Sequence, residues 1–265
     1  MTSAICWEIG AKVSVELAYH AKELFYFCPE DKCLSEVVPA KINNLFFRAP
    51  DSHCPGCVNE KRKSTESSVE RGPNSRKPSI SQNPIPSHLG PIARACKGSK
   101  PTILEMRELA LRSRLEAPRH YGTLLEVVSA WCLMNRDDRQ SSPLHIGHLQ
   151  QTYLDAFKSL RHASKDGTLD SGQKILYGCA TVKEFNYSFY VTTRNKFKLG
   201  DKAIPIRIRI RSGDALFQSL KSNQEVMLFL HGAIPKLDKH IEINSTDAYS
   251  GMIILQKDLS TLTNL

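Results

Sequence analysis

A cluster of cysteine and histidine residues near the N-terminus constrains the fold of this chain more than any other feature. Cys28 and Cys33 are separated by four residues, and His53, Cys54 and Cys57 follow about twenty residues later. A tetrahedral zinc ion takes four Cys or His ligands, and structural sites draw them from two short loops. The spacing therefore predicts that a Zn2+ ion organises the N-terminal part of the chain.

Only four of these five residues fit one tetrahedral ion. We expect Cys28, Cys33 and Cys57 as ligands, with either His53 or Cys54 in the fourth position. Adjacent side chains of an extended chain point in opposite directions, so only one of these two neighbours is expected to bind. Four protein ligands leave no position for a catalytic water, which predicts a structural site. Buried free thiols and redox pairing are the alternative interpretations.

The residues around these ligands form a longer pattern. It consists of an aromatic-x-Cys-Pro-x3-Cys motif at Cys28, an apolar stretch with Phe46-Phe47-Arg48, and His53-x3-Cys57. Over about thirty residues this pattern resembles the N-terminal zinc-ribbon-like segment of CoiA-like competence proteins and related bacterial proteins. Such segments often precede a nuclease-like domain, but we find no Asp…Glu-x-Lys core of the kind those nucleases use. The resemblance therefore implies a bacterial or mobile-element setting and DNA as a partner, and it does not imply nuclease activity.

Composition divides the chain into three regions. Residues 1–60 contain the metal cluster and form the predicted zinc-binding module. Residues 61–100 are rich in Pro, Ser and Gly, and nine Lys/Arg against two Glu give this region a charge of 9 − 2 = +7. So few apolar residues cannot offset the entropy of ordering the segment, which predicts a flexible basic linker. Residues 101–265 form the predicted α+β domain.

The first part of that domain, residues 102–165, has helical periodicity. Leucines punctuate a basic helix that is expected to end near Pro118, and an apolar helix is predicted over 124–134. A third helix is predicted over 144–160, because its apolar residues recur at spacings of three and four.

The second part, residues 172–257, changes to a period of two and is predicted to be β-rich. The segment GDALFQSLKSN between the third and fourth strands predicts a short helix. This order of elements is typical of a five-stranded OB-type barrel, and a generic small α+β sheet domain is the alternative. The predicted strands are KILYGCATV, NYSFYVTT, IPIRIRIR, EVMLFLHG, HIEIN and GMIILQ.

The motif His145-Ile146-Gly147-His148 matches the HIGH signature of class I aminoacyl-tRNA synthetases and related nucleotidyltransferases. In those enzymes the motif holds ATP phosphates at a helix N-terminus after the first strand of a parallel α/β domain. This chain has alternating strands instead and lacks a KMSKS-like partner. We therefore interpret the motif as the start of the third helix, with Ser142 near its N-cap.

One predicted strand carries three arginines in alternation with three isoleucines, over residues 206–211. Strict alternation places the isoleucines on one sheet face and the arginines on the other, which a half-buried strand also does without any ligand. Three guanidinium groups in a row favour an anion above them, and aromatic residues of the preceding strand would stack bases unless they belong to the core. The predicted nucleic-acid contacts are Tyr187, Phe189, Arg194, Arg207, Arg209 and Arg211.

The chain has 265 residues, a formal net charge of +9 and eight cysteines. A positive excess favours an anionic partner. Neither a signal peptide nor a membrane-length apolar run is found, so we expect a reduced, cytoplasmic protein with no membrane partner. The prediction is a zinc-containing, non-catalytic nucleic-acid-binding protein, with DNA favoured over RNA, acting as an accessory factor in a bacterial or mobile-element DNA-related system. The alternatives are a protein-interaction adaptor subunit of a multi-protein bacterial complex and a nuclease or nucleotidyltransferase-like enzyme.

Overall fold

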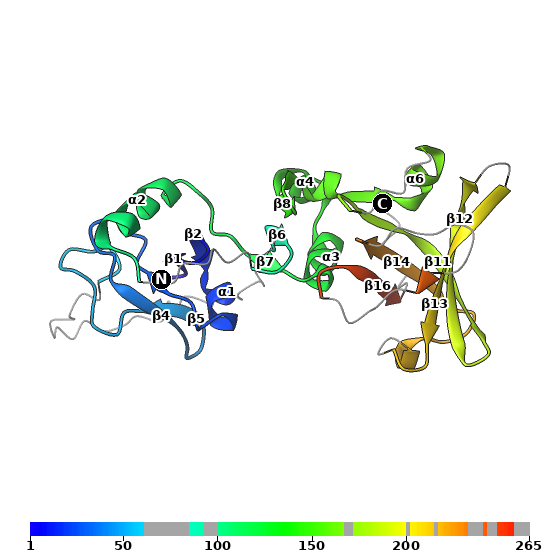
Figure 1. The fold of residues 1–265 in the computed structure, drawn as a ribbon, viewed down its shortest axis with the longest axis horizontal. Coiled ribbons are helices and arrows are strands. Elements are labelled where there is room, and N and C mark those ends of the chain that lie inside the picture. The colour runs from blue at the N-terminus through cyan, green and yellow to red at the C-terminus, as the bar shows by residue number, and fades with distance from the viewer. Residues whose placement is uncertain are drawn as a thin grey trace, which may run out of the picture. The chain divides into compact units, whose positions relative to one another are not determined.

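A computed structural model shows a mixed α+β protein that divides into two compact units (Figure 1). Unit 1 comprises Met1–Ile85 and Ile92–Tyr121, and unit 2 comprises Pro86–Pro91 and Gly122–Leu265. None of the described helices is long and apolar enough to cross a membrane. The structure describes residues 1–60, 85–92, 100–166, 172–199, 202–214, 217–232, 241–242 and 248–256.

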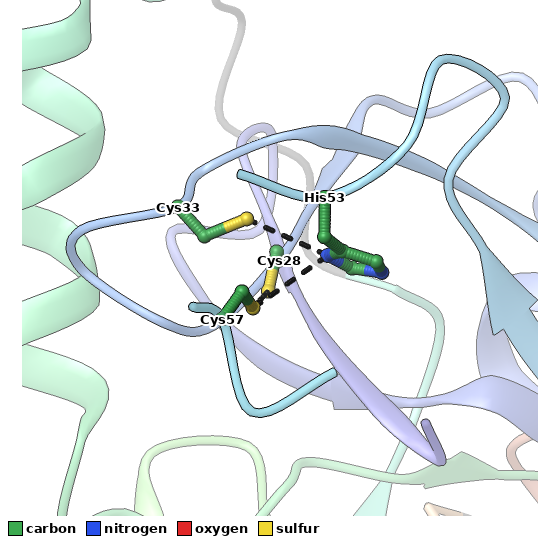
Figure 2. Close-up of side chains that lie close together, drawn as sticks. All are labelled: Cys28, Cys33, His53 and Cys57. Carbon is green, nitrogen blue, oxygen red and sulfur yellow. Dashed lines mark hydrogen bonds between the residues drawn. The ribbon is translucent and has the colours of Figure 1, made fainter. Parts of the chain in front are cut away.

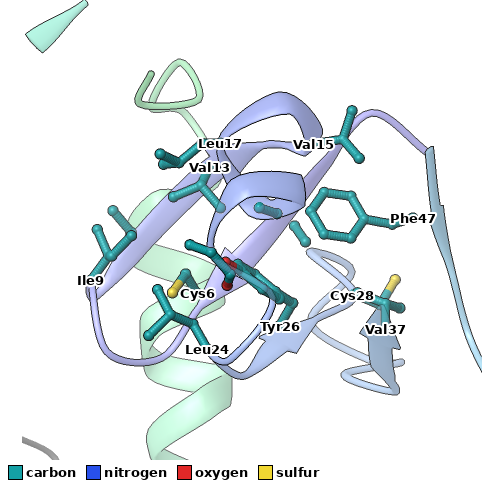
Figure 3. Close-up of a cluster of buried hydrophobic side chains, with 14 of the residues drawn as sticks. Cys6, Ile9, Val13, Val15, Leu17, Leu24, Tyr26, Cys28, Val37 and Phe47 are labelled. Carbon is teal, nitrogen blue, oxygen red and sulfur yellow. The ribbon is translucent and has the colours of Figure 1, made fainter. Parts of the chain in front are cut away.

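Unit 1 is built on a five-stranded sheet with the order β2-β1-β3-β4-β5. Each neighbouring pair is antiparallel, and the short helix α1 (Val15–His20) packs against the sheet. Figure 3 shows the core, where Tyr26 lies beside Phe47 and its hydroxyl donates to the Ala21 carbonyl at 2.6 Å. The strands are β1 (Ser3–Cys6), β2 (Ala11–Ser14), β3 (Tyr26–Phe27), β4 (Glu36–Lys41) and β5 (Leu45–Arg48).

The helix α2 (Ile103–Ser113) belongs to unit 1. A capping box between Thr102 and Glu105 begins it, and its buried face, which includes Met106, packs in one cluster with Trp7 near β1. The predicted basic helix is thus present, but the boundary between the units lies near residue 121 and not at residue 100. Composition marks the basic segment, whereas the boundary depends on which core the amphipathic helix covers.

Part of the predicted linker is paired in unit 2. The strand β6 (His88–Leu89) pairs in parallel with β8 (Pro143–Ile146), and Leu89 is buried. Pro86–Pro91 therefore belong to unit 2 and do not fit the predicted flexible tether, because β6 is paired with β8 and Leu89 is buried. The remainder of that prediction, apart from Lys100, lies outside the described residues.

The predicted helix over 124–134 is present as α3 (Leu124–Leu133), which is followed by α4 (Arg136–Ser141). The predicted helix over 144–160 is wrong. Strands β8 and β9 (Leu149–Thr152) form a hairpin there, with Gly147 at a φ of +60° in the turn. A left-handed glycine favours a tight turn over a continuing helix. The elements α5 (Tyr153–Ala156), β10 (Phe157–Ser159) and α6 (Leu160–Asp166) follow, and β7 (Tyr121–Gly122) completes a small sheet of order β7-β6-β8-β9.

The predicted β-rich region forms a sheet of order β15-β13-β12-β11-β14-β16, with β10 pairing in parallel with β11. The helix predicted between the third and fourth strands is a 3-10 turn over Phe217–Ser219. In the described residues the path is open at both ends, so the closure of an OB-type barrel stays a prediction. The strands are β11 (Ile175–Phe185), β12 (Ser188–Leu199), β13 (Lys202–Arg211), β14 (Glu225–His231), β15 (Ile241–Glu242) and β16 (Gly251–Gln256).

The two faces of this sheet differ. One face carries the largest apolar cluster of unit 2, which includes Ile206 and Ile208 of β13 and Leu160 of α6. On the other face, α3 covers the start of β11, where the Trp131 ring packs against Tyr177 with a centroid distance of 4.9 Å. Further along β11 this second face carries polar and charged side chains, which form one of the candidate sites.

Candidate metal centre and basic sheet face

The first pair of candidate metal ligands lies on the turn between β3 and β4. Cys28 directly follows β3, and its N–H donates to the Ser35 carbonyl at 2.9 Å. The N–H of Cys33 donates to the Glu30 carbonyl at 2.8 Å, and Leu34 closes the turn at a φ of +49°. These backbone bonds bring Cys28 and Cys33 together at the same end of the sheet.

The second pair lies on the loop after β5. The N–H of Cys57 donates to the Cys54 carbonyl at 3.1 Å, and Gly56 adopts a φ of +80° in this turn. The N–H of Gly56 also donates to the Glu60 carboxylate at 2.8 Å. A side chain is strained at such a φ, so the glycine permits the turn that places Cys57 beside His53.

Four side chains from these two loops meet in unit 1. The ligand atoms of Cys28, Cys33, His53 and Cys57 all lie within 4.8 Å of one another (Figure 2). The Cys28 and Cys57 Sγ atoms are 3.8 Å apart, and His53 Nδ1 lies 3.4 Å from Cys33 Sγ and 3.8 Å from Cys57 Sγ. Zn–S bonds of ~2.3 Å and Zn–N bonds of ~2.0 Å at tetrahedral angles give S–S distances of ~3.8 Å and S–N distances of ~3.5 Å. The four residues therefore fit a single tetrahedral metal ion.

Cys54 does not join this group. Its side chain is exposed, and its thiol donates to the Cys33 carbonyl at 3.5 Å. Its backbone N–H donates to Cys33 Sγ at 3.4 Å. Of the two neighbours that the sequence leaves open, the structure groups His53 with the three thiols, and Cys54 contributes its backbone.

Polar groups around the cluster hydrogen-bond to the sulfur atoms. The Asn59 N–H donates to Cys57 Sγ at 3.4 Å, and the Asn59 side-chain amide donates to Cys28 Sγ at 3.5 Å. The Ser35 hydroxyl lies 3.3 Å from Cys33 Sγ. Such outer contacts orient metal ligands and stabilise thiolates. Sequence reasoning missed Ser35 and Asn59, and the available signal was their position two residues after a ligand cysteine.

The three thiols differ in acidity when no metal is bound. Burial raises the pKa of Cys28 to about 12 and also raises the pKa of Cys57. Burial opposes ionisation of Cys33 as well, but hydrogen bonds from Ser35 and from the Cys54 N–H outweigh it and lower the pKa of Cys33 to about 6. Because a metal binds the thiolate, an incoming ion meets one ready ligand at neutral pH and displaces protons from the other two.

The second candidate site is the exposed part of the second sheet face in unit 2. Hydrogen-bonded registers between β11, β12 and β13 align its side chains in three cross-strand rows. We call these nine residues the basic face. The rows are Phe185–Ser188–Arg211, Lys183–Tyr190–Arg209 and Thr181–Thr192–Arg207.

The alternation predicted for β13 is present. The isoleucines at 206, 208 and 210 are at most 1% exposed, and Arg207 and Arg211 between or after them are exposed. Arg209 is half-buried, and its Nε donates to the Ser188 hydroxyl at 3.3 Å. The β13 strand thus buries its apolar side and turns its guanidinium groups to the opposite side.

The two aromatic residues predicted to share the arginine face do not do so. Phe189 is 5% exposed on the apolar face, where its ring packs against Phe217 at a centroid distance of 4.8 Å. Tyr187 lies in the two-residue turn between β11 and β12, with Asn186 before it, and is 87% exposed. The prediction assumed one continuous strand with both residues on the binding face, but Tyr187 lies in the turn, and the register of β12 with β13 pairs Phe189 with Ile210 on the apolar face.

The aromatic residues that do lie on the basic face are Phe185 and Tyr190, and Lys183 adds a charge. Sequence reasoning missed all three because their face depends on the register between β11 and β12. Arg194, which was also predicted to contact nucleic acid, forms an ion pair with Glu225. Its charge is therefore partly offset.

The histidine motif has a different setting from that of a nucleotide-binding enzyme. His145 lies on β8, and His148 lies in the turn before β9. The His145 ring stacks on the His88 ring at a centroid distance of 4.3 Å. Neither histidine stands at the N-terminus of a helix, so the interpretation as a helix start is wrong and the phosphate-binding geometry of the HIGH motif is absent here.

Comparisons with known proteins give no assignment. No family model matches the chain, and neither curated proteins nor solved structures include a significant match.

Proposed function

We propose that this chain is a zinc-containing, non-catalytic nucleic-acid-binding protein. The observation that carries the proposal is the alignment of Arg207, Arg209 and Arg211 on one face of β13, above a strand whose isoleucines are buried. Like charges on one face repel one another, and phosphate groups above them relieve that repulsion. Because the N-terminal module resembles the zinc-ribbon-like segment of CoiA-like competence proteins, we further propose DNA as the ligand and an accessory role in a bacterial system.

The charge balance of this sheet surface supports binding to a polyanion. The cationic residues of this surface are Lys183, Arg194, Arg207, Arg209 and Arg211. Among the described residues, the strand registers align two anionic residues with them, Glu225 opposite Thr181 and Glu242 opposite Arg209, so the sum is 5 − 2 = +3. Neutralising phosphates releases condensed counterions, so binding that rests on these groups weakens as salt rises.

The proposed metal is Zn2+, and its role is structural. Three thiols and one imidazole are ligands that zinc prefers, and they occupy all four tetrahedral positions. No position is left for a water molecule, so the ion would supply folding energy to unit 1 and no chemistry. Cysteines stay available as ligands more readily where thiols are kept reduced, and the proposed location is therefore the cytoplasm.

The test is fluorescence anisotropy with labelled DNA and RNA at several salt concentrations. We expect binding that weakens steeply with salt, and we expect the triple variant Arg207→Gln/Arg209→Gln/Arg211→Gln to lower the salt slope by about two to three. The matched control, Arg107→Gln/Arg112→Gln/Arg114→Gln, removes two exposed arginines of α2 and the exposed arginine at its C-cap, and it has the same net charge as the triple variant.

The control is expected to retain most of the affinity and the salt slope. Equal losses of affinity in both variants would mean that only the net charge matters, and this result would overturn the assignment of the basic face as the binding surface. No binding at low salt would overturn the function itself and favour the adaptor role. Circular dichroism of each variant establishes that the fold is retained.

A further inference from the structure

We propose that the basic face binds single-stranded nucleic acid, with bases stacked on Phe185 and Tyr190 and phosphates held by the cations beside them. This inference rests on the proposed function and specifies its ligand. The observation behind it is that aromatic and cationic side chains occupy the same cross-strand rows, which the register of three strands fixes.

The middle row places an aromatic ring between two cations. Tyr190 pairs with Lys183 on one side and with Arg209 on the other, and neighbouring strands lie ~4.8 Å apart. A base that stacks on the Tyr190 ring would therefore have its own phosphates within reach of both charges. Aromatic side chains on an open sheet next to cations are the arrangement with which single-strand-binding modules hold successive bases.

The next row adds a second ring. Phe185 is 64% exposed although a benzyl side chain gains nothing from water, and it shares a row with Arg211. Successive rows on a strand face are ~6.8 Å apart, so the rings of Phe185 and Tyr190 lie on adjacent steps of one surface. Tyr187, 87% exposed at the tip of the same hairpin, extends the aromatic edge.

A single strand fits this surface better than a duplex. Phe185 has no group that hydrogen-bonds to a phosphate or to the edge of a base, and stacking on an unpaired base is the contact that covers most of its ring. In a duplex the faces of the bases are already stacked on one another, and only the phosphates would meet the sheet. The helix α3 covers the neighbouring part of the same sheet face, where Trp131 packs on Tyr177. The surface open to a ligand is therefore limited to the three rows of the basic face.

The experiment compares labelled single-stranded DNA, single-stranded RNA of the same sequence, and the corresponding DNA duplex at one salt concentration. We expect at least tenfold tighter binding of the single strands. We expect Phe185→Ala and Tyr190→Ala each to weaken single-strand binding about fivefold or more and to leave duplex binding unchanged. Tyr190→Phe, which keeps the ring, is the matched control and is expected to bind as the parent does.

A second measurement reports stacking directly. The native Trp7 and Trp131 are 8% and 2% exposed, so a Phe185→Trp variant adds an exposed indole on the basic face. We expect single strands to quench its fluorescence over the same concentration range as the anisotropy change.

The outcomes separate this inference from the proposed function. Duplex binding as tight as single-strand binding, or aromatic variants that bind like the parent while the arginine variant does not, would overturn the single-strand inference and leave nucleic-acid binding standing. No binding of any of the three nucleic acids would overturn both. A difference between the DNA and RNA arms identifies which single strand is preferred.

Discussion

At the scale of single residues, the metal cluster depends on which side chain of an adjacent pair turns inward. His53 points its Nδ1 toward Cys33 and Cys57, while the neighbouring Cys54 is exposed and uses its backbone N–H. With a metal bound, the two neighbours would divide two tasks: His53 would be a ligand, and the Cys54 N–H would orient the Cys33 sulfur. This division gives a sharp test, because the chain contains its own matched control.

We expect Cys57→Ser to lose the bound zinc and Cys54→Ser to keep it. Removing Cys57 takes away one of four ligands, whereas removing the Cys54 side chain leaves the backbone N–H that contacts Cys33 in place. Zinc content of the purified variants, measured by mass spectrometry, checks the prediction. Full metal occupancy in Cys57→Ser would contradict the assignment of the ligands.

The unequal acidities of the thiols predict the proton stoichiometry of zinc binding. At pH 8 the Cys28 thiol, with a pKa of about 12, and the Cys57 thiol, whose pKa is raised by burial, are both protonated, while Cys33 at about 6 is already a thiolate. Zinc binding should therefore release about two protons, and the affinity should fall as the pH is lowered. Calorimetry in buffers of different ionisation enthalpy measures the number, and a release of three or none would contradict it.

The sequence predicts the five candidate ligands of the metal cluster, but it does not predict which four of them come together. The Cys and His spacing is sufficient to name the five candidates, because few other patterns put soft ligands on two short loops. The choice between His53 and Cys54 depends on the backbone of the loop, including Gly56 at its positive φ. The expectation that Tyr187 and Phe189 share the arginine face failed because Tyr187 lies in a turn and the strand register places Phe189 on the apolar face.

At the scale of elements, strands were easier to predict than helices. The period of two is clear in β13, whose isoleucines are buried on one face, and β14 is recognisable as a continuous apolar run because both of its faces are buried. Residues 144–160 also show spacings of three and four, but these residues divide among β8, β9, α5 and β10. An apolar spacing cannot reveal that Gly147 will adopt a left-handed φ and reverse the chain.

The helix α2 provides an element-scale test of the boundary between the units. Met106 is 2% exposed and packs with Trp7, whereas Leu111 on the same helix is 50% exposed. We expect Met106→Ala to lower the free energy of unfolding of unit 1 by about 2–3 kcal/mol and Leu111→Ala to change it by less than about 0.5 kcal/mol.

Hydrogen exchange of β1 and β2 in increasing urea measures the free energy of unfolding of unit 1 in both α2 variants. Exchange in β11 to β14 is the internal reference for unit 2. Destabilisation of unit 2 by Met106→Ala, with unit 1 unchanged, would place α2 with the other core.

At the scale of the whole molecule, the two candidate sites belong to different units. The metal cluster lies in unit 1, and every residue of the basic face lies in unit 2. The fold of each unit is supported by its own apolar clusters. Metal binding and nucleic-acid binding are therefore expected to be separable.

Chelation tests this separation. We expect treatment with a zinc chelator to raise hydrogen exchange in the ligand loops of unit 1 and to leave both the exchange of β11 to β14 and the affinity for single-stranded nucleic acid unchanged within about twofold. The untreated protein and protein with zinc restored are the controls. A loss of binding that zinc restores would mean that unit 1 takes part in the nucleic-acid site.

The turn between β11 and β12 has a further consequence. Asn186 and Tyr187 both adopt positive φ, at 47° and 56°, as in a type I′ hairpin whose preferred second residue is glycine. A tyrosine in this conformation costs ~1 kcal/mol, so Tyr187→Gly should raise the melting temperature of unit 2. With tyrosine at position 187 the hairpin tip is less stable than it would be with glycine, but it exposes an aromatic ring to solvent. We therefore expect Tyr187→Gly to have a higher melting temperature and a lower affinity for single-stranded nucleic acid than the parent.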